Sequence, residues 1–312
     1  MTTGIHHITA IASDAVKNVE FYSQHLGLRL VKKTVNQDDV ETYHLFFGDK
    51  LGHPGMDLTF FIFRPPMQGK NGNGLVTKIS LAVPEDSLPF WKKRFETLKI
   101  KQKEIITQFG KKRIVFFDSD GQQLELVGIS PADLDNASDI WTTKEVTKEQ
   151  AIRNFYSTTL SVTSQTMISS ILLYVFGYTF IEKEDNTFLY EIKNSNRASH
   201  LEIKEDPSAS QGFNAAGTVH HIAFRAKDEK EQLVMRDKVL ELGLYPTEVI
   251  NRFYFKSVYF RTPAGILFEI ATDGPGFTAD EKESELGKKL ALPPFLENQR
   301  KDIELNLPSL NI

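Results

Sequence analysis

The sequence predicts an α+β fold of four βαβββ modules that pair into two eight-stranded open barrels. Two repeats support this prediction. The strand-like segment GIHHITAI at residues 4–11 returns as GTVHHIAF at residues 217–224, and each copy carries a histidine pair. The strand–turn–strand segment SVYFRTPAGILFEIA at residues 257–271 is similar to IVFFDSDGQQLELV at residues 114–127. Segments that recur in this way indicate one supersecondary unit copied along the chain.

Each module is expected to contain a strand, a helix and three further strands. In the first module, Val16 to Leu26 carries apolar residues at helical spacing, and Gly27 is a typical helix stop. In the last module, Gln232 to Leu242 repeats this pattern before Gly243. Alternating runs around turn glycines predict the closing hairpins, with another copy at residues 55–63. The modules are expected at residues 4–64, 74–128, 152–205 and 217–272.

The modules suggest a division of the whole chain. We expect an N-terminal pair of modules, a polar linker, a C-terminal pair and a tail, at residues 1–128, 129–150, 151–277 and 278–312. Within the tail, the charged run from Asp280 to Leu290 predicts a helix. A second short helix is expected after Pro293 and Pro294.

Composition narrows the class of protein. The chain has 312 residues, of which 40% are hydrophobic and 25% charged, so a packed globular core is expected. A formal net charge of -4 gives no reason to expect nucleic acid or an anionic membrane as a partner. The absence of cysteine excludes disulfides and thiolate metal ligands. The start of the chain does not resemble a signal peptide, and no apolar stretch is long enough to span a bilayer. A cytoplasmic location is therefore expected, and the sequence does not indicate an oligomeric state.

Two positions in each module carry candidate metal ligands. A single βαβββ unit leaves one face of a curved sheet uncovered, so two units are expected to close into a cup with a ligand pocket inside. The compared positions are the second residue of the histidine pair and the residue four places after the turn glycine. They are His7 and Thr59, Lys78 and Glu125, Thr159 and Glu202 by a less regular alignment, and His221 and Glu269.

Only a pairing of the first module with the last brings together two imidazoles and a carboxylate. This donor set suits a divalent metal with open positions for substrate. We therefore predict that these two modules meet in space and that His7, His221 and Glu269 hold a metal. Glu269 lies between Phe268 and Ile270, so strand alternation points its carboxylate into the cup, where an unpaired charge is costly. A simpler interpretation is that histidine pairs at strand starts bond only to backbone carbonyls.

The chain resembles the vicinal oxygen chelate superfamily, which includes glyoxalases, bleomycin resistance proteins and extradiol dioxygenases. Within it, the chain is most similar to ring-cleaving dioxygenases of the hydroquinone type. The shared features are HHIT at residues 6–9, VHHIAF at 219–224, the spacing of Arg252 and Tyr259 before Glu269, and LPPFLENQR at 292–300. The resemblance covers nearly the whole chain, and this combination is more specific than the HHI motif alone.

The resemblance implies an Fe(II)-dependent dioxygenase that acts on a hydroquinone- or catechol-like diphenol and O2. Mn(II), Zn(II) or Ni(II) are alternative occupants of the metal site. It also implies that His6, His220, Arg252 and Tyr259 act as catalytic residues around the metal. A simpler interpretation places His6 and His220 on the outer face, because strict alternation sends neighbours to opposite faces. Tyr259 would then fill the core, and Arg252 would be solvated. His44 is expected to line the pocket at most, not to bind the metal.

Two other functions fit parts of the pattern. A glyoxalase-I-like isomerase or lyase would use Zn(II) or Ni(II) and two facing carboxylates, but Thr59 stands where the second carboxylate is expected. A non-enzymatic protein that binds an aromatic compound, as resistance proteins do, would not require the metal triad.

Overall fold

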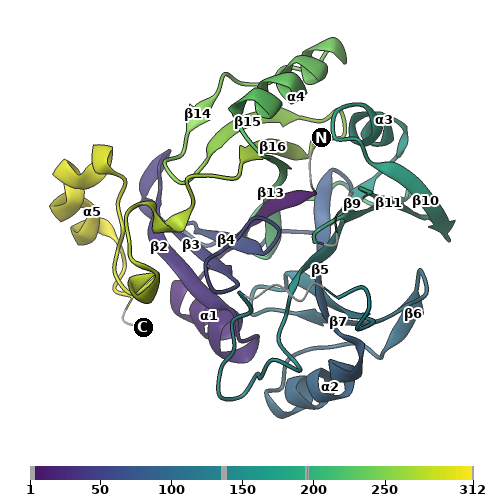
Figure 1. Ribbon diagram of the computed structural model, residues 1–312, viewed down its shortest axis with the longest axis horizontal. Helices are drawn as coiled ribbons and strands as arrows, with labels where there is room; N and C mark the ends of the chain where they lie inside the picture. Colours follow the sequence, from purple (N-terminus) through teal and green to yellow (C-terminus); the bar gives the residue numbers. More distant parts are fainter. Residues whose placement is uncertain (1–3, 135–138, 194, 196, 311–312) are drawn as a thin grey trace.

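The computed structural model describes residues 4–134, 139–193, 195 and 197–310. Its strands form two curved sheets, which we call the first and second barrel (Figure 1). The first barrel contains β1 (Ile5–Ala12), β2 (Arg29–Asn36), β3 (Asp39–Gly48), β4 (Asp57–Ile62), β13 (Thr218–Ala226), β14 (Ile250–Asn251), β15 (Lys256–Arg261) and β16 (Leu267–Thr272). The second contains β5 (Leu75–Pro84), β6 (Ile106–Gln108), β7 (Lys111–Phe117), β8 (Gln123–Ile129), β9 (Asn154–Val162), β10 (Thr179–Glu184), β11 (Thr187–Glu191) and β12 (His200–Glu205).

Each module carries its helix between the first and second strand. These helices are α1 (Ala15–Val19) with its π-helical extension η1 (Glu20–His25), η2 (Glu85–Ser87) with α2 (Leu88–Thr97), α3 (Thr166–Tyr174) and α4 (Glu229–Glu241). The end of the chain adds η3 (Phe277–Ala279), η4 (Glu283–Glu285), η5 (Pro294–Gln299) and α5 (Arg300–Asn306). The predicted α+β fold of four βαβββ modules in two eight-stranded open barrels is confirmed.

The first and last modules share one barrel, as predicted. The strand order of the first barrel is β14-β15-β16-β13-β1-β4-β3-β2, and that of the second is β10-β11-β12-β9-β5-β8-β7-β6. At the centre of the first barrel β1 runs antiparallel to β13, with Thr9 opposite His221. Both barrels therefore join strands from the two halves of the chain, and the division into residues 1–128 and 151–277 stays a prediction.

The outer faces of the two sheets enclose the main hydrophobic core. On β4, Phe60 points outward and packs on Tyr22 of η1, with ring centroids 4.4 Å apart. Phe21 of η1 stacks on Phe116 of the second barrel, and Phe176 stacks on Phe224 of the first. Because the helices and outer faces supply this core, the inner face of each barrel is free to carry polar groups.

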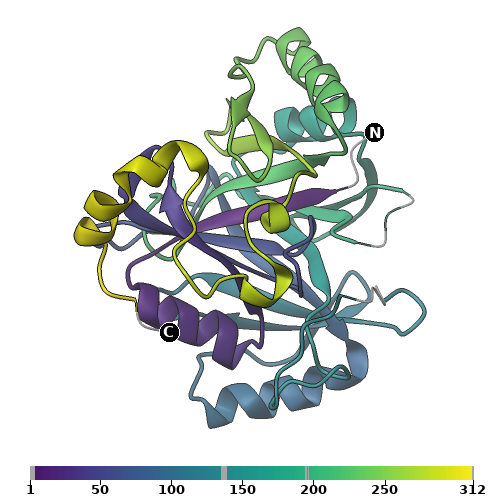
Figure 2. The ribbon, with the colours of Figure 1, turned by 60° about the vertical axis from the view of Figure 1, so that its left-hand side comes forward.

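The tail differs from the sequence prediction at Asp280 to Leu290. This segment is not a long helix but an extended path with the single short turn η4, and it lies along β2 (Figure 2). Lys32 of β2 is fully buried and pairs with Asp280, 2.7 Å away, and with Glu281. Pairing its carboxylates with this cation outweighs the helical preference of the charged run. The second predicted helix is present as η5 and α5.

The described part of the chain contains no helix that is long and apolar enough to cross a membrane.

Candidate metal centre

His7, His221 and Glu269 converge at the middle of the first barrel. Nε2 of His7 lies 3.2 Å from Nε2 of His221 and 3.2 Å from Oε2 of Glu269. Nε2 of His221 lies 3.0 Å from the same carboxylate oxygen. All three side chains are buried. The structure thus brings together the three residues that the repeat pattern selected, and their role as metal ligands stays a prediction.

Strand register places these side chains side by side. Glu269 of β16 lies beside Ala223 in a parallel pairing, so it neighbours the strand that carries His221. The antiparallel pairing of Thr9 with His221 sets β1 against the same strand. Because residues two apart on a strand share a face, Thr9 and His7 both face the interior.

Both histidine pairs sit at irregularities in the β1–β13 ladder. The register advances by two residues on β1 between Ile5 and His7, which leaves His6 as the extra residue. It advances by two on β13 between His221 and Val219, which leaves His220 as the extra residue. An extra residue bends the strand and re-aims its side chain. The simpler interpretation, in which strict alternation places His6 and His220 on the outer face, does not describe these irregular strand segments.

His6 determines which nitrogen of His7 carries the proton. Nε2 of His6 lies 3.1 Å from the carbonyl oxygen of Thr272, which can only accept, so this nitrogen donates. Burial lowers the pKa of His6 well below its usual value, so the ring is neutral and its Nδ1 is an acceptor. Nδ1 of His7, 3.0 Å away, therefore donates to it, and Nε2 of His7 presents a lone pair to the centre.

The second pair is arranged in the same way. Nδ1 of His220 and Nδ1 of His221 lie 2.8 Å apart. Burial lowers the pKa of His220 to about 3 and also lowers that of His221, so both rings are neutral at pH 7. Burial alone would raise the pKa of Glu269, but His7 and His221 hold it well below its usual value. Nε2 of His7 and Nε2 of His221 therefore face one ionised carboxylate.

A divalent metal fits these donor atoms. Oε2 of Glu269 is buried and makes no hydrogen bond within the described residues, although both Nε2 atoms lie close to it. Three donors on one face of an octahedron, each about 2.1 Å from the metal, lie about 3.0 Å apart. The observed separations are 3.0–3.2 Å. This matches the facial arrangement of two histidines and a carboxylate, which leaves three positions open.

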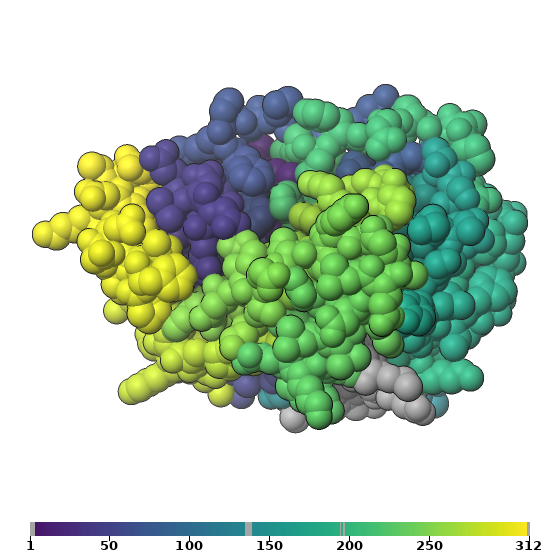
Figure 3. Space-filling model, turned by 90° about the horizontal axis from the view of Figure 1, so that it is seen from above, coloured from purple at the N-terminus to yellow at the C-terminus, as the bar shows by residue number. Residues whose placement is uncertain are grey.

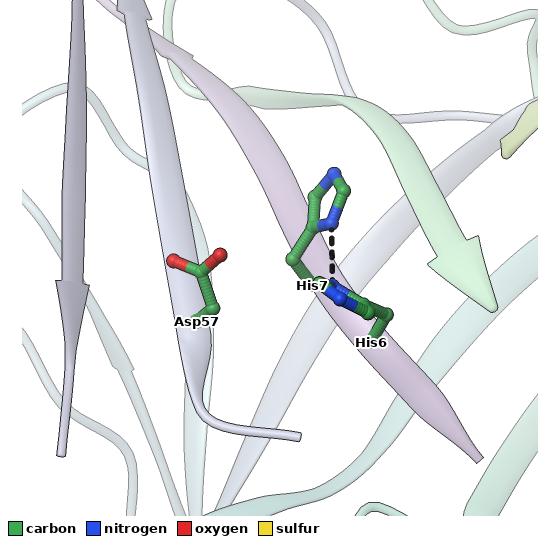
Figure 4. Close-up of side chains that lie close together, drawn as sticks. All are labelled: His6, His7 and Asp57. Carbon is green, nitrogen blue, oxygen red and sulfur yellow. Dashed lines mark hydrogen bonds between the residues drawn. The ribbon is translucent and has the colours of Figure 1, made fainter. Parts of the chain in front are cut away.

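A second group of potential ligands, His6, His7 and Asp57, lies next to this centre (Figure 4). The Nδ1 atoms of the two histidines are hydrogen-bonded to each other and so are not both free to bind a metal. Both oxygens of the Asp57 carboxyl are buried without a hydrogen-bond partner among the described residues. Burial, together with Asp49 and Glu269, raises the pKa of Asp57 well above its usual value, which disfavours the charged form that a metal would need. This group is therefore the weaker metal site.

Tyr259 and Arg252 reach the same cavity as the metal ligands. Tyr259 pairs with Glu269 in the sheet, and its ring lies 5.8 Å from that of His221. Burial raises its pKa, so it is a phenol at neutral pH. Nε of Arg252 donates to the Tyr259 hydroxyl at 3.3 Å, while Nη1 and Nη2 hold Asp38 at 2.9 and 2.8 Å. The simpler interpretations, a core tyrosine and a solvated arginine, do not describe these positions.

Sequence reasoning gave too little weight to His44. It lines the cavity of the metal centre, and burial lowers its pKa well below the usual value. Thr59 Oγ1 donates to Thr9 Oγ1 at 2.8 Å, so it accepts the N–H of His44 Nε2 at 2.9 Å. Nδ1 of His44 consequently has a lone pair. His44 and Phe46 lie two residues apart on β3 and so share one face of the strand. Because Phe46 lines the same cavity, this spacing is the sequence signal that could have identified His44.

The second barrel carries charged side chains at the corresponding place. Strand register sets Ser80 beside Glu125 and Thr159 beside Glu202, as Ala223 lies beside Glu269. In each module of the second barrel, the position that corresponds to His221 lies two residues before Ser80 or Thr159. It is Lys78 in the second module, as predicted. In the third module it is Ser157, so the alignment on Thr159 is wrong.

These charges neutralise one another. Lys78 Nζ lies 3.0 Å from Glu125, and Nη1 of Arg113 lies 3.1 Å from Glu125 and 2.6 Å from Glu202. The two cations occupy the space between the carboxylates, and no histidine takes part in these contacts. Among the described residues of the second barrel, no group of histidines and carboxylates matches the donor set of the first barrel.

Comparison with known proteins identifies the family. A model of the Glyoxalase/Bleomycin resistance protein/Dioxygenase superfamily matches residues 4–270. The chain therefore belongs to this superfamily, and the predicted resemblance is confirmed. The crystal structure of maize glyoxalase I has a TM-score of 0.65 and 14% identity, with 86% of this chain and 92% of that chain covered. It agrees in fold alone.

More similar relatives carry the names of ring-cleaving dioxygenases. MhqE of Bacillus subtilis, which is provisionally named a ring-cleaving dioxygenase, is 40% identical to this chain over 99% of both proteins. The chlorohydroquinone/hydroquinone 1,2-dioxygenase of Sphingobium indicum is 32% identical, with 96% of this chain and 94% of that protein covered. A crystal structure from Bacillus subtilis, provisionally named a dioxygenase, has a TM-score of 0.93 and 39% identity over 99% of this chain and 98% of that chain. These relatives support an enzyme of the ring-cleaving dioxygenase class.

Proposed function

We propose that this protein is an Fe(II)-dependent extradiol-type dioxygenase that cleaves the ring of a hydroquinone- or catechol-like diphenol. The observation that carries the proposal is the facial set of His7, His221 and Glu269 on the inner face of the first, open barrel. Two histidines and a carboxylate with open positions are the donor set of non-haem Fe(II) oxygenases. Fe(II) bound there would supply the one-electron chemistry that lets O2 react with a diphenolate. Both oxygen atoms enter the product at the broken carbon–carbon bond, so no further reductant is consumed.

The side chains of the cavity divide the remaining work. We assign Tyr259 as a hydrogen-bond donor to the reacting oxygen, because its phenol stays protonated and Arg252 fixes its hydroxyl. The guanidinium of Arg252 stabilises developing negative charge. His44 presents a lone pair and can take the proton of the substrate phenol. His6 and His220 act as positioning residues through the Nδ1 contacts that they make with the ligands.

Two structural features weaken the alternative functions. The isomerase requires a second carboxylate. Thr59 occupies that position, because it pairs with Thr9 in the first module as Glu269 pairs with Ala223 in the last. Its hydroxyl is hydrogen-bonded to His44 and Thr9 and offers no carboxylate to a metal. A protein that only binds aromatic compounds gives no reason for three buried metal-donor atoms to lie within 3.2 Å of one another.

Oxygen uptake tests the proposal. The protein is purified anaerobically, loaded with Fe(II) and supplied with methylhydroquinone or catechol. We expect uptake that is lost in His221→Ala and Glu269→Gln and kept in His25→Ala, whose ring is not in the first barrel. Absence of uptake with both diphenols, despite one bound Fe(II) per chain, would refute the dioxygenase. The Zn(II)- or Ni(II)-dependent isomerase would then be tested with a hemithioacetal.

A further inference from the structure

The two carboxylate oxygens of Glu269 have different surroundings. Oγ of Ser257 lies 2.5 Å from Oε1, and it must donate, because an ionised carboxylate can only accept. The other oxygen, Oε2, is buried without a hydrogen-bond partner among the described residues. It lies 3.2 Å from Nε2 of His7 and 3.0 Å from Nε2 of His221. The serine hydroxyl and the two imidazoles therefore approach different oxygens of the same carboxylate.

Strand register places the Ser257 hydroxyl beside Glu269. On β15, Tyr259 pairs with Glu269 and Ser257 pairs with Ala271. Residues two apart on a strand share a face, so Ser257 is the diagonal neighbour of Glu269 on the inner face of the barrel. Ser257 is fully buried, and its hydrogen bond to a charged acceptor is at the short, strong end of its class. The contact therefore fixes the rotation of the carboxylate.

The carboxylates of the second barrel are held differently. Ser157 donates to Oε1 of Glu202 at 3.1 Å, and Thr159 donates to its Oε2 at 2.9 Å. Both oxygens of Glu125 likewise accept hydrogen bonds. Hydroxyl contacts thus occur in both barrels, but at Glu269 the hydroxyl takes one oxygen and leaves the oxygen that faces the imidazoles to a metal.

The orientation of Glu269 decides how many positions a bound metal keeps open. A carboxylate occupies one position when it binds through one oxygen and two positions when it binds through both. With His7, His221 and one oxygen of Glu269, an octahedral ion keeps three positions open, and with both oxygens it keeps two. The cavity beside these ligands has a volume of about 40 Å³. At about 10–15 Å³ for each water molecule, it has room for about three.

We infer that Ser257 is a positioning residue that holds Oε1 away from the metal, so that Glu269 binds through Oε2 alone and three positions stay open. The inference rests on the metal centre of the proposed function but not on the reaction. In a dioxygenase the third position has a use, because a diphenol that binds through both of its oxygens takes two positions and O2 needs another. Ser257 then determines whether substrate and O2 can occupy the centre together.

Solvent reaches the interior of the first barrel close to this centre. A cavity of about 530 Å³ is lined by Ile11 and Ala12 of β1 and by His220, the neighbour of His221. Figure 3 looks onto this face, where purple atoms near the start of the chain lie in a hollow between blue and green segments. The open positions of a bound ion can therefore be counted with labelled water.

Water bound to Mn(II) tests the inference without any turnover. Mn(II)-loaded protein is prepared in ordinary water and in water enriched in oxygen-17, and the broadening of the electron paramagnetic resonance lines gives the number of bound waters. We expect three in the wild type and two in Ser257→Ala, because the released Oε1 then also binds the metal. Ser80→Ala is the matched control, since it removes a hydroxyl that donates to Oε2 of Glu125 at 2.8 Å in the second barrel. It should keep three bound waters.

A second pair of variants separates the hydroxyl from the packing around it. Ser257→Thr and Ser257→Val have nearly the same shape and differ by a hydroxyl against a methyl group. We expect three bound waters in Ser257→Thr and two in Ser257→Val. A hydroxyl with a merely structural role would change thermal unfolding and leave the number at three in both. The pair also gives a result if Ser257→Ala does not fold, and thermal unfolding verifies that each variant is folded.

The outcomes separate this inference from the proposed function. Two bound waters in the wild type, or three in Ser257→Ala and Ser257→Val, would overturn the role of Ser257 whether or not the protein consumes O2. The expected fall from three to two, in a protein that takes up no O2 with either diphenol, would keep the role of Ser257 and refute the dioxygenase. A wild type that binds no Mn(II) would overturn the metal centre and both proposals with it.

Discussion

Replacement of His6 by phenylalanine tests the proton arrangement at the metal centre. His6 Nδ1 accepts a hydrogen bond from Nδ1 of His7, and His6 Nε2 donates a hydrogen bond to the carbonyl oxygen of Thr272. A phenylalanine ring is somewhat larger than imidazole but is flat like it, and it can keep the edge contact with Phe255, whose centroid lies 5.3 Å from that of His6. It removes the acceptor, so His7 must either keep a buried unpaired N–H or move its proton to Nε2, where the metal lone pair is needed.

The size of the effect follows from that choice. A buried donor without a partner costs about 1–3 kcal/mol, and about 1.4 kcal/mol corresponds to a tenfold change in an equilibrium constant. Loss of a group that orients a metal-bound histidine typically weakens metal affinity by about 10–100-fold. We therefore expect the dissociation constant for Mn(II) to rise by about 10–100-fold in His6→Phe.

Free Mn(II) measured by electron paramagnetic resonance gives this constant without any need for activity. His6→Gln, whose amide oxygen can accept the same proton, should recover part of the affinity. His25→Phe, a histidine outside the barrel interior, should bind Mn(II) as the wild type does. An affinity in His6→Phe within about twofold of the wild type, in a folded protein, would contradict the proposed proton arrangement.

Three further predictions concern stability. Burial lowers the pKa of His200 to about 4 and that of His220 to about 3. In the unfolded chain both histidines have the ordinary pKa of about 6.5, so below that pH the unfolded chain binds more protons than the folded protein. The free energy of unfolding should therefore fall as the pH drops from about 6.5 towards 4. Urea unfolding of the metal-free protein at a series of pH values measures this dependence, and a flat profile would contradict it. Lys78→Met leaves buried carboxylates short of a cation and should cost about 3–5 kcal/mol by urea unfolding. Lys92→Met removes an exposed ion pair with Glu104 and should leave the free energy of unfolding close to that of the wild type. Lys32→Met removes the cation that holds the tail on β2, and limited proteolysis should then cut the tail faster while the barrels stay intact; unchanged cleavage would show that the apolar contacts suffice.

The repeat pattern predicted the arrangement of modules because it shows which side chains of each strand share a face and where each strand recurs along the chain. It could therefore place His7, His221 and Glu269 in one barrel without any knowledge of the loops. The same reasoning failed at His6 and His220, because a β-bulge arises from the pairing of two distant strands and leaves no mark in either strand alone.

Two other features depended on information that a single sequence lacks. Ser157, not Thr159, matches the ligand histidines, since the third module carries neither a histidine pair nor a regular turn from which to count. The charged run after Asp280 has helical propensity, but the buried Lys32 on β2 draws its carboxylates into an extended path. Tertiary ion pairing of this kind overrides a local preference of a few tenths of a kcal/mol per residue, roughly the spread among ordinary helix formers.

The pairing of the first module with the last also has a consequence for biosynthesis. His7 and His221 lie 214 positions apart, and Glu269 comes later still. During translation, the half-barrel of β1 to β4 leaves the ribosome long before its partner strand β13 exists. Until then the hydrogen-bonding edge of β1 has no native neighbour, and an uncovered edge of this kind readily pairs with another chain. The three candidate ligands therefore cannot meet before translation has passed residue 269.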